Sequence, residues 1–219
     1  MKVGVLSLQG DYPEQAAAIR ALAGVGGVRM VRNRADLEQV DALLMPGGES
    51  TTVGDLLDRT DLREPLAERI RDGLPVLATC AGLILLARTV EPSSFGADPA
   101  SIGAIDVSIR RNDYGRQAES FEAPVQVEGL RAPFPGVFIR APRITGVGAG
   151  VEVFARQGAE RVGVRSGSIW GLTFHPELSP DRRVHELWLA AAGRSAQPAN
   201  QKIKKSPSTK TKPTRRNHG

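Results

Sequence analysis

Short apolar runs alternate with helix-forming segments through the first 90 residues, and this alternation restricts the folds open to the chain. Apolar runs of strand length lie at 2–8, 28–32, 41–45 and 76–79. Between them, apolar residues recur with helical spacing at 13–23, 35–39 and 61–72. Strands that alternate with helices are typical of a parallel sheet covered on both faces. The first 90 residues therefore predict a doubly wound arrangement.

The second half has a different pattern, in which short β-prone segments are separated by glycines and turn residues. We expect strands near 104–110, 122–128, 136–141, 151–156, 160–166 and 169–174, and a final helix at 180–192. The predicted fold is thus α/β, a doubly wound, mostly parallel sheet with helices on both faces and added β segments in the second half. We expect one domain over residues 1–193.

The positive charge of the chain is concentrated at its end. Residues 194–219 hold eight Lys or Arg and no Asp or Glu, which leaves 21 of the 29 basic residues against 24 acidic residues in 1–193. The tail has one aliphatic residue larger than alanine, Ile203, so burial cannot offset the entropy of ordering it. We expect a disordered basic tail, with weak polyanion binding as the alternative role. The acidic balance of 1–193 argues against a nucleic-acid-binding function.

Cysteine content and the N-terminal sequence indicate where the protein resides. One cysteine cannot form a disulfide within the chain. The apolar run at 3–8 is too short for the core of a signal peptide or for a membrane span. We therefore expect a cytoplasmic protein with no membrane partner.

Cys80 lies between two apolar runs in the segment PVLATCAGLILLA, residues 75–87. A cysteine in such surroundings can be an inert core residue. If the run before it is a strand and the run after it a helix, however, Cys80 occupies a tight strand-to-helix turn, which Ala81 and Gly82 are small enough to permit. Such a turn presents a nucleophile above the sheet and points backbone amides at the same place. This chain has Ala78 where many such turns have glycine.

A thiol nucleophile needs a base, and three histidines are available. His218 lies in the tail and His185 within the final predicted helix, which leaves His175 in the segment GLTFHPELS. Pro176 ends the strand there. Glu177 follows two positions after His175, and strand-end residues two apart point to the same side, so its carboxylate can orient the imidazole. A structural histidine is the alternative at both His175 and His185.

The segment MPGGESTTVGDLL, residues 45–57, places two glycines between a predicted strand and a helix. Glycines let backbone amides approach a ligand closely, so the amide of Gly48 could form an oxyanion hole with that of Ala81. The alternative is a plain turn in which Ser50 or Thr51 caps the helix.

Phosphate, metal and cofactor chemistry have little support in the sequence. The glycines at 47–48 lack the lysine of a phosphate-binding loop and the spacing of a dinucleotide fold. Cys80 and His175 are not spaced as zinc ligands. We expect no cofactor and no metal.

The motifs Pro-Gly-Gly-Glu-Ser, Thr-Cys-Ala-Gly and His-Pro-Glu together resemble those of a class I (triad) glutamine amidotransferase. Three further stretches narrow the resemblance: GVLSLQGDYPEQ at 4–15, RNDYGRQAESFE at 111–122 and FIRAPRI at 138–144. With them the chain is similar to the PdxT or SNO family, the glutaminase subunits of pyridoxal 5′-phosphate synthase. The resemblance covers about residues 2–190.

The resemblance implies a role for each matching residue. Cys80 would be the nucleophile, His175 the acid and base, and Glu177 the residue that orients His175. The glutamine contacts would fall on Gly48, Glu49, Ser50, Arg111, Ile139 and Arg140. An acidic loop and two arginines suit a zwitterionic amino acid, whose ammonium needs an anion and whose carboxylate needs donors.

The resemblance also implies a reaction and a partner. The substrate would be L-glutamine, hydrolysed to glutamate and ammonia through a thioester. The ammonia would pass to the synthase subunit, PdxS or SNZ, in a hetero-oligomer that makes pyridoxal 5′-phosphate. Segment 89–104 is longer than the family pattern, and the tail after 193 has no counterpart in it.

Three other functions remain open at the level of the sequence. The chain could be a glutaminase that serves another synthase, such as the one in histidine biosynthesis. It could be a cysteine peptidase on a related fold, although the motifs at 111–122 and 138–144 argue against both alternatives. It could also be a catalytically silent nucleic-acid-binding module that uses its tail, which the acidic balance of 1–193 disfavours.

Overall fold

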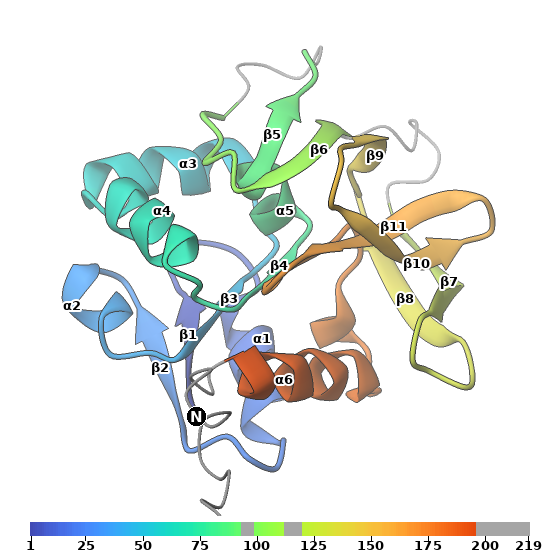
Figure 1. Ribbon diagram of the computed structural model, residues 1–219, viewed down its shortest axis with the longest axis horizontal. Helices are drawn as coiled ribbons and strands as arrows, with labels where there is room; N and C mark the ends of the chain where they lie inside the picture. The colour runs from blue at the N-terminus through green and yellow to red at the C-terminus, as the bar shows by residue number, and fades with distance from the viewer. Residues whose placement is uncertain (93–98, 112–119, 196–219) are drawn as a thin grey trace, which may run out of the picture.

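The computed structural model describes residues 1–92, 99–111 and 120–195 (Figure 1). The predicted disordered tail lies outside these residues, apart from its first two positions. Most of the motif at 111–122 and the middle of segment 89–104 also lie outside them. No helix within the described ranges is long and apolar enough to cross a membrane.

Five parallel strands form one half of a nine-stranded sheet, whose order is β2-β1-β3-β4-β12-β11-β10-β7-β8. They are β1 (Lys2–Leu6), β2 (Gly27–Val31), β3 (Ala42–Met45), β4 (Val76–Thr79) and β12 (Ile169–Leu172). Strands β3, β4 and β12 are buried at every residue, as expected for strands covered on both faces. Because β1, β3, β4 and β12 are parallel neighbours, their carboxyl ends meet at one edge of the sheet.

Antiparallel strands from the second half complete this sheet. They are β11 (Glu160–Ser166), β10 (Glu152–Gln157), β7 (Ser120–Val127) and β8 (Phe134–Ile139). The predicted α/β class, a doubly wound parallel sheet with β segments added in the second half, is confirmed.

Side chains of the parallel strands alternate between two apolar cores, because successive residues of a strand point to opposite faces. Leu43 and Met45 of β3 belong to one core, and Leu44 belongs to the other. The first core is covered by α2 (Arg34–Leu37), α3 (Ser50–Arg59), α4 (Arg63–Arg71) and α5 (Ala81–Leu86). The second is covered by α1 (Tyr12–Arg20) and α6 (Arg183–Ser195), which Figure 1 shows close together.

A second sheet of three strands, β5 (Ala87–Val90), β6 (Ile105–Arg110) and β9 (Arg143–Val147), lies beside the first core. The sequence does not predict β5 or β9. Strand β5 follows α5 directly, with no turn residue to mark the change. Strand β9 contains a glycine and, within the described part of the chain, pairs with β6 alone. Strand β6 ends at Arg110, so this sheet delivers Arg111 to the edge of the molecule where the parallel strands end.

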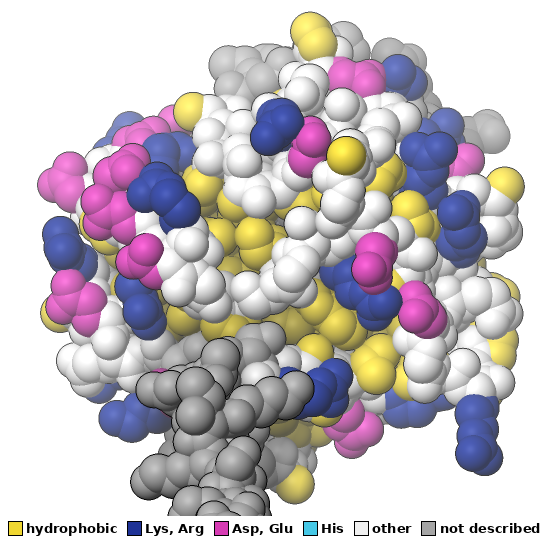
Figure 2. Space-filling view, viewed as in Figure 1, with side chains coloured by type: hydrophobic (Ala, Val, Ile, Leu, Met, Phe, Trp, Pro, Cys, Tyr) yellow, Lys and Arg dark blue, Asp and Glu magenta, His cyan; other side chains and the backbone are white. Residues whose placement is uncertain are grey.

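Charged side chains of both signs are intermixed on the face drawn in Figure 2. Neither lysine and arginine nor aspartate and glutamate gather there into a patch of one sign among the described residues. On that face the described part of the chain therefore lacks the broad basic surface that nucleic-acid binding requires.

Candidate active site

A pocket lies at the carboxyl ends of β1, β3, β4 and β12, where ligands bind in open parallel sheets. Its lining brings together segments from almost the whole chain: Gln9, Gly10, Asp11, Gly48, Glu49, Ser50, Cys80, Ile84, Arg111, Ile139, Arg140 and His175. Eight of the ten predicted site residues are among them. The other two, Ala81 and Glu177, lie directly behind the pocket wall.

Cys80 occupies the predicted turn between β4 and α5. Its backbone has φ 48° and ψ −105°, a conformation that residues with a Cβ seldom adopt. Its amide donates to the carbonyl of Leu172 in β12, at 2.8 Å. A Cβ on Gly82 would lie 2.3 Å from the carbonyl oxygen of Met45, so only glycine fits behind the turn. The prediction of a tight strand-to-helix turn that small residues permit is confirmed.

His175 lies where the chain leaves β12 and passes β8. Its amide donates to the carbonyl of Val137 at 2.8 Å, and the residue is 2% exposed. The imidazole packs against the backbone of Gly47, where a Cβ would lie 2.2 Å from Cε1. The first glycine of the Pro-Gly-Gly loop is therefore needed to make room for the histidine ring.

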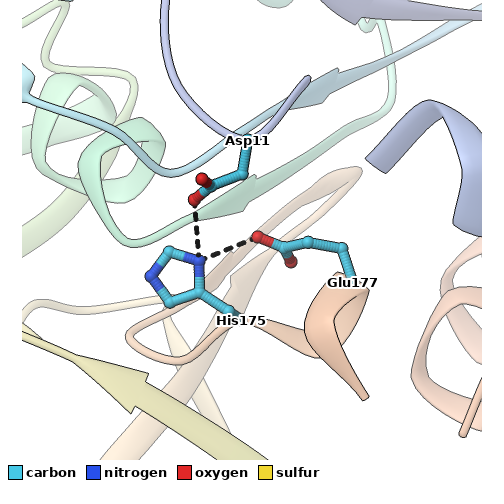
Figure 3. A group of neighbouring side chains, drawn as sticks. All are labelled: Asp11, His175 and Glu177. Atoms are coloured by element: carbon cyan, nitrogen blue, oxygen red, sulfur yellow. Dashed lines mark hydrogen bonds and ion pairs between the residues drawn. The ribbon is translucent and has the colours of Figure 1, made fainter. Parts of the chain in front are cut away.

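Two carboxylates meet the same nitrogen of His175 (Figure 3). Nδ1 lies 2.8 Å from Oε1 of Glu177 and 3.2 Å from Oδ2 of Asp11. Glu177 reaches the ring from a 3-10 turn, Pro176–Leu178. The predicted proximity of Glu177 is confirmed, but the predicted reason, strand alternation, is wrong because the strand ends before His175.

The surroundings of His175 favour its charged form. Burial alone would lower the pKa of His175, but Asp11, Cys80 and Glu177 outweigh it and raise that pKa to about 12. Burial raises the pKa of Glu177, and the nearby imidazolium opposes that effect. With Nδ1 held by carboxylates, Nε2 is the nitrogen left for proton transfer. It is buried, and Cys80 is among the side chains that interact with this histidine.

Asp11 is a site residue that the sequence reasoning missed. It is the N-cap residue of α1, yet its side chain makes no cap hydrogen bond and instead approaches His175. Its amide donates to the carbonyl of Gly47 at 3.1 Å. The available signal was its position, since a polar residue just after the first strand must lie at the same sheet edge as the Pro-Gly-Gly loop.

The Pro-Gly-Gly-Glu-Ser loop is held by Glu49 and Gln9. Glu49, and neither Ser50 nor Thr51, is the N-cap of α3, and its carboxylate accepts from the amides of Thr51 at 3.1 Å and Thr52 at 2.6 Å. Burial opposes the charge of Glu49, but hydrogen bonds from Thr52 and Thr51 lower its pKa overall. The Glu49 amide donates to Oε1 of Gln9 at 2.9 Å.

Two arginines enter the pocket from the second half of the chain. Arg111 is 7% exposed, and its guanidinium lies 3.4 Å from Oε1 of Glu49 and 3.3 Å from Oγ1 of Thr51. Arg140 follows Ile139 at the end of β8 and has φ 42°, a left-handed conformation. The structure therefore brings Arg111, Ile139 and Arg140 to the pocket as the sequence predicts.

Asp11, His175 and Glu177 also offer three ligand atoms within 4.8 Å of one another. Both carboxylates approach Nδ1 at hydrogen-bond distance, 2.8 and 3.2 Å. We interpret the group as a hydrogen-bonded histidine with two acceptors, because a metal ion would have to replace the Nδ1 proton between them.

The chain is similar to a known family and to named proteins and structures. It matches the SNO glutamine amidotransferase family over residues 5–193. It is 48% identical over 191 residues to the pyridoxal 5′-phosphate synthase subunit PdxT of Mycolicibacterium vanbaalenii, covering 87% of this chain and 97% of that protein. It is 46% identical over 198 residues to the protein of the same name from Streptomyces coelicolor, covering 89% and 96%. A crystal structure of a glutamine amidotransferase matches with a TM-score of 0.80 at 43% identity, covering 87% and 98%. The chain therefore belongs to the SNO glutamine amidotransferase family.

Proposed function

We propose that this protein is a glutaminase that hydrolyses L-glutamine to glutamate and ammonia through Cys80, His175 and Glu177. The observation that carries the proposal is the histidine. Its Nδ1 is bonded to a buried carboxylate, and it shares a pocket with a cysteine on a strained turn. A nucleophile, a base and a residue that orients the base are the three parts that covalent acyl transfer needs.

The first step is attack of the Cys80 thiolate on the side-chain carboxamide of glutamine. An adjacent imidazolium stabilises a thiolate, and the raised pKa of His175 supplies that charge. A tetrahedral oxyanion forms, and the C–N bond breaks as His175 gives a proton to the leaving ammonia. The thioester that remains is hydrolysed by a water from which His175 takes a proton. The C–S bond breaks, glutamate is released, and the Cys80 thiolate and the His175 imidazolium are restored.

The oxyanion is stabilised by the backbone amides of Gly48 and Ala81 in this proposal. Gly48 lines the pocket, and Ala81 follows Cys80 directly at the start of α5. The peptide between Gly47 and Gly48 is held by the bond from the Asp11 amide to the Gly47 carbonyl. Its reorientation is the step that would bring the Gly48 amide to the oxyanion.

The remaining pocket residues bind the amino-acid end of glutamine. Arg111 and Arg140 supply donors for the α-carboxylate, and Glu49 supplies negative charge for the ammonium. Ser50 and Ile139 complete the wall of the pocket. Glu49 is bonded to Arg111 and caps α3, so the loop and the arginine form one connected unit.

We further propose that the ammonia passes to the synthase subunit PdxS or SNZ for pyridoxal 5′-phosphate formation. The support is the similarity to proteins named pyridoxal 5′-phosphate synthase subunit PdxT, which extends over nearly their full length. A reaction whose product must reach a second active site gains from a hydrolytic site that is completed only in the complex.

Glutamate release measured with and without the synthase subunit tests this function. We expect weak release from this chain alone and a strong rise when the synthase subunit is added, with pyridoxal 5′-phosphate formed from glutamine. No glutamate release under either condition would contradict the proposal. Equal release under both would contradict the coupling but not the hydrolysis.

A further inference from the structure

Glu177 uses only one of its two carboxylate oxygens toward His175. The other oxygen, Oε2, accepts a hydrogen bond from Nε2 of Gln15 in α1, at 2.8 Å. The Glu177 side chain and Gln15 are both 0% exposed. A buried carboxylate keeps its charge only where donors replace the lost water, and Gln15 supplies the donor that His175 does not.

The orientation of the Gln15 amide follows from its other partners. Its nitrogen also lies 3.2 Å from Oγ1 of Thr79, and its oxygen lies 3.1 Å from Nε2 of His185 in α6. If the amide were turned over, its oxygen would face the carboxylate of Glu177 and two acceptors would meet. With the nitrogen toward Glu177, the Gln15 oxygen needs a donor, which the Nε2 proton of His185 provides.

His185 is suited to this single role. It is 0% exposed, and its Nδ1 has no hydrogen-bond partner among the described residues. A proton on Nδ1 would therefore have no acceptor there, which favours the neutral tautomer with the proton on Nε2. The sequence interpretation left His185 as a structural histidine; the structure places it two hydrogen bonds away from Glu177.

Packing alone does not account for these side chains. Gln15, Thr79 and His185 are each 0% exposed and lie beside the apolar core that α1 and α6 cover. Apolar side chains of similar size would fill this space without the cost of burying polar groups. These side chains form a hydrogen-bonded network that ends on the Glu177 carboxylate, which is bonded to His175. This arrangement indicates that the network holds the carboxylate in position.

We propose that Gln15 is a positioning residue that holds the Glu177 carboxylate ionised and oriented toward His175, and that His185 fixes the donor orientation of the Gln15 amide. The proposal rests on the proposed glutaminase function. Neither Gln15 nor His185 lines the pocket, so the effect falls on the turnover step and leaves glutamine binding unchanged.

The charged groups around Glu177 determine the expected pH effect. Asp11 and His175 act on its carboxylate, and Nη1 of Arg182 lies 3.4 Å from the Glu177 carbonyl oxygen. Replacing Gln15 leaves these charges in place but removes the hydrogen bond from its amide to Oε2 of Glu177. That bond stabilises the ionised carboxylate more than the protonated form. Glu177 then takes up a proton at a higher pH, so the acid limb of the kcat profile moves upward.

Two variants of Gln15 test the proposal in the full chain with its synthase partner. Gln15→Met keeps the length of the side chain but removes the amide donor without adding a titratable group, and Gln15→Leu is a second apolar replacement. We expect kcat to fall roughly 10- to 100-fold, as for other residues that orient a catalytic group, with KM within about twofold and the acid limb moved to higher pH. Ile19→Val, a buried change in the same helix, is the matched control and keeps the wild-type acid limb.

Proton and nitrogen NMR of histidine-labelled protein gives a readout that needs no activity. In the wild type we expect a low-field proton on Nδ1 of His175, and His185 as the neutral Nε2–H tautomer. The His175 resonance is expected to move or vanish in Gln15→Leu and Gln15→Met but to persist in Ile19→Val. The tautomer of His185 is measured in the wild type. This part of the experiment therefore tests the orientation of Gln15 even if the Gln15 variants fail to fold.

The two proposals fail in different ways. A wild-type enzyme that releases no glutamate would contradict the glutaminase function. The NMR measurement would still test the hydrogen bonding of Gln15, His175 and His185 in that case. An unchanged kcat, acid limb and His175 resonance in both Gln15 variants would overturn the positioning role. An Nδ1–H tautomer of His185 in the wild type would overturn its part in orienting Gln15.

Discussion

The two sides of His175 differ in burial and in the kind of residue that forms them. On the closed side, Glu177, Gln15 and His185 are buried and joined by hydrogen bonds of 2.8 to 3.1 Å. On the open side, the Asp11 side chain is 35% exposed, and Gly48 and its neighbour Gly47 form the loop. One side is a connected buried network, and the other is made of glycine backbone and a partly hydrated carboxylate.

The difference indicates how the work is divided between the two sides. A buried carboxylate in low dielectric interacts strongly with the imidazole and cannot be replaced by water. A partly exposed carboxylate is screened and can be replaced in part by water. We infer that the closed side determines the orientation and proton of His175, whereas the open side adjusts to substrate and partner.

The largest expected effect is a difference in kcat between variants of the two carboxylates, Glu177 and Asp11. We expect Glu177→Gln to lower kcat roughly 10³-fold, about 4 kcal/mol of transition-state stabilisation, and Asp11→Asn to lower it about tenfold or less. Both are read from glutamate release in the presence of the synthase subunit. Both changes remove a charge but keep the shape, so each serves as the control for the other. Equal losses would break the distinction between a closed and an open side.

His185, on the closed side, is expected to lower the stability of the fold at acid pH. Burial, with a smaller contribution from Arg182, lowers the pKa of His185 from 6.5 to about 4. Between these values the unfolded chain binds a proton that the folded chain does not, so stability falls as the pH falls from 6.5 to 4. The loss from this residue is roughly 3 kcal/mol.

Urea unfolding of the wild type and of His185→Gln at pH 7 and pH 4.5 measures this contribution. We expect the variant to lose less free energy of unfolding than the wild type between the two pH values, because glutamine does not titrate. The same loss in both proteins would show that His185 is not buried as a neutral imidazole.

On the open side, Gly48 is expected to affect the reorientation of the loop more than the binding of the synthase subunit. It has φ 155°, and a Cβ there would lie 2.5 Å from Oε1 of Gln9. We expect Gly48→Val to lower partner-stimulated hydrolysis roughly 10- to 100-fold while binding of the synthase subunit changes less. Gly193→Val is the matched control, because a Cβ on Gly193 meets no atom within 4 Å. Loss of binding in step with loss of hydrolysis would assign Gly48 to the interface.

The smallest effect is expected from removal of the basic tail, residues 194–219. A chain truncated after Gly193 lacks the basic segment, whose composition predicts no fixed geometry that could serve the site. We expect partner-stimulated kcat/KM to remain within tenfold of the full chain, about 1.4 kcal/mol. A larger fall would show that the tail takes part in coupling to the synthase.

The parallel half of the fold could be predicted because its signals are local. Each strand and helix of the first 79 residues is a separate apolar or periodic run, and Cys80 follows directly from the strand that precedes it. Strands β5 and β9 could not be predicted, because β5 continues an apolar helix without a break and β9 is defined by its pairing with β6. Strand pairing depends on residues distant in sequence, which local propensity does not report.

The same limit applies to the site. His175 and Glu177 are two residues apart, so a local pattern could link them, although through a 3-10 turn instead of a strand. Asp11 contacts His175, and Gln15 contacts Glu177, each across more than 160 residues of sequence. The parallel pairing of β1 with β3 places the carboxyl end of β1 beside that of β3, near these contacts. The position of Asp11 just after the first strand indicates the sheet edge at which it lies, but no local pattern identifies its contact with His175 or that of Gln15 with Glu177.

The central claim, that Cys80 and His175 release ammonia for chemistry on another chain, is tested most directly with one variant and two nitrogen donors. Pyridoxal 5′-phosphate formation is measured for Cys80→Ala mixed with the synthase subunit, with either glutamine or ammonium supplied, and the wild type as reference. We expect no product from glutamine and near wild-type product from ammonium, because only the hydrolytic step is lost. Product from glutamine would show that Cys80 is not the nucleophile, and failure of ammonium to restore product would place essential chemistry of the synthase on this chain.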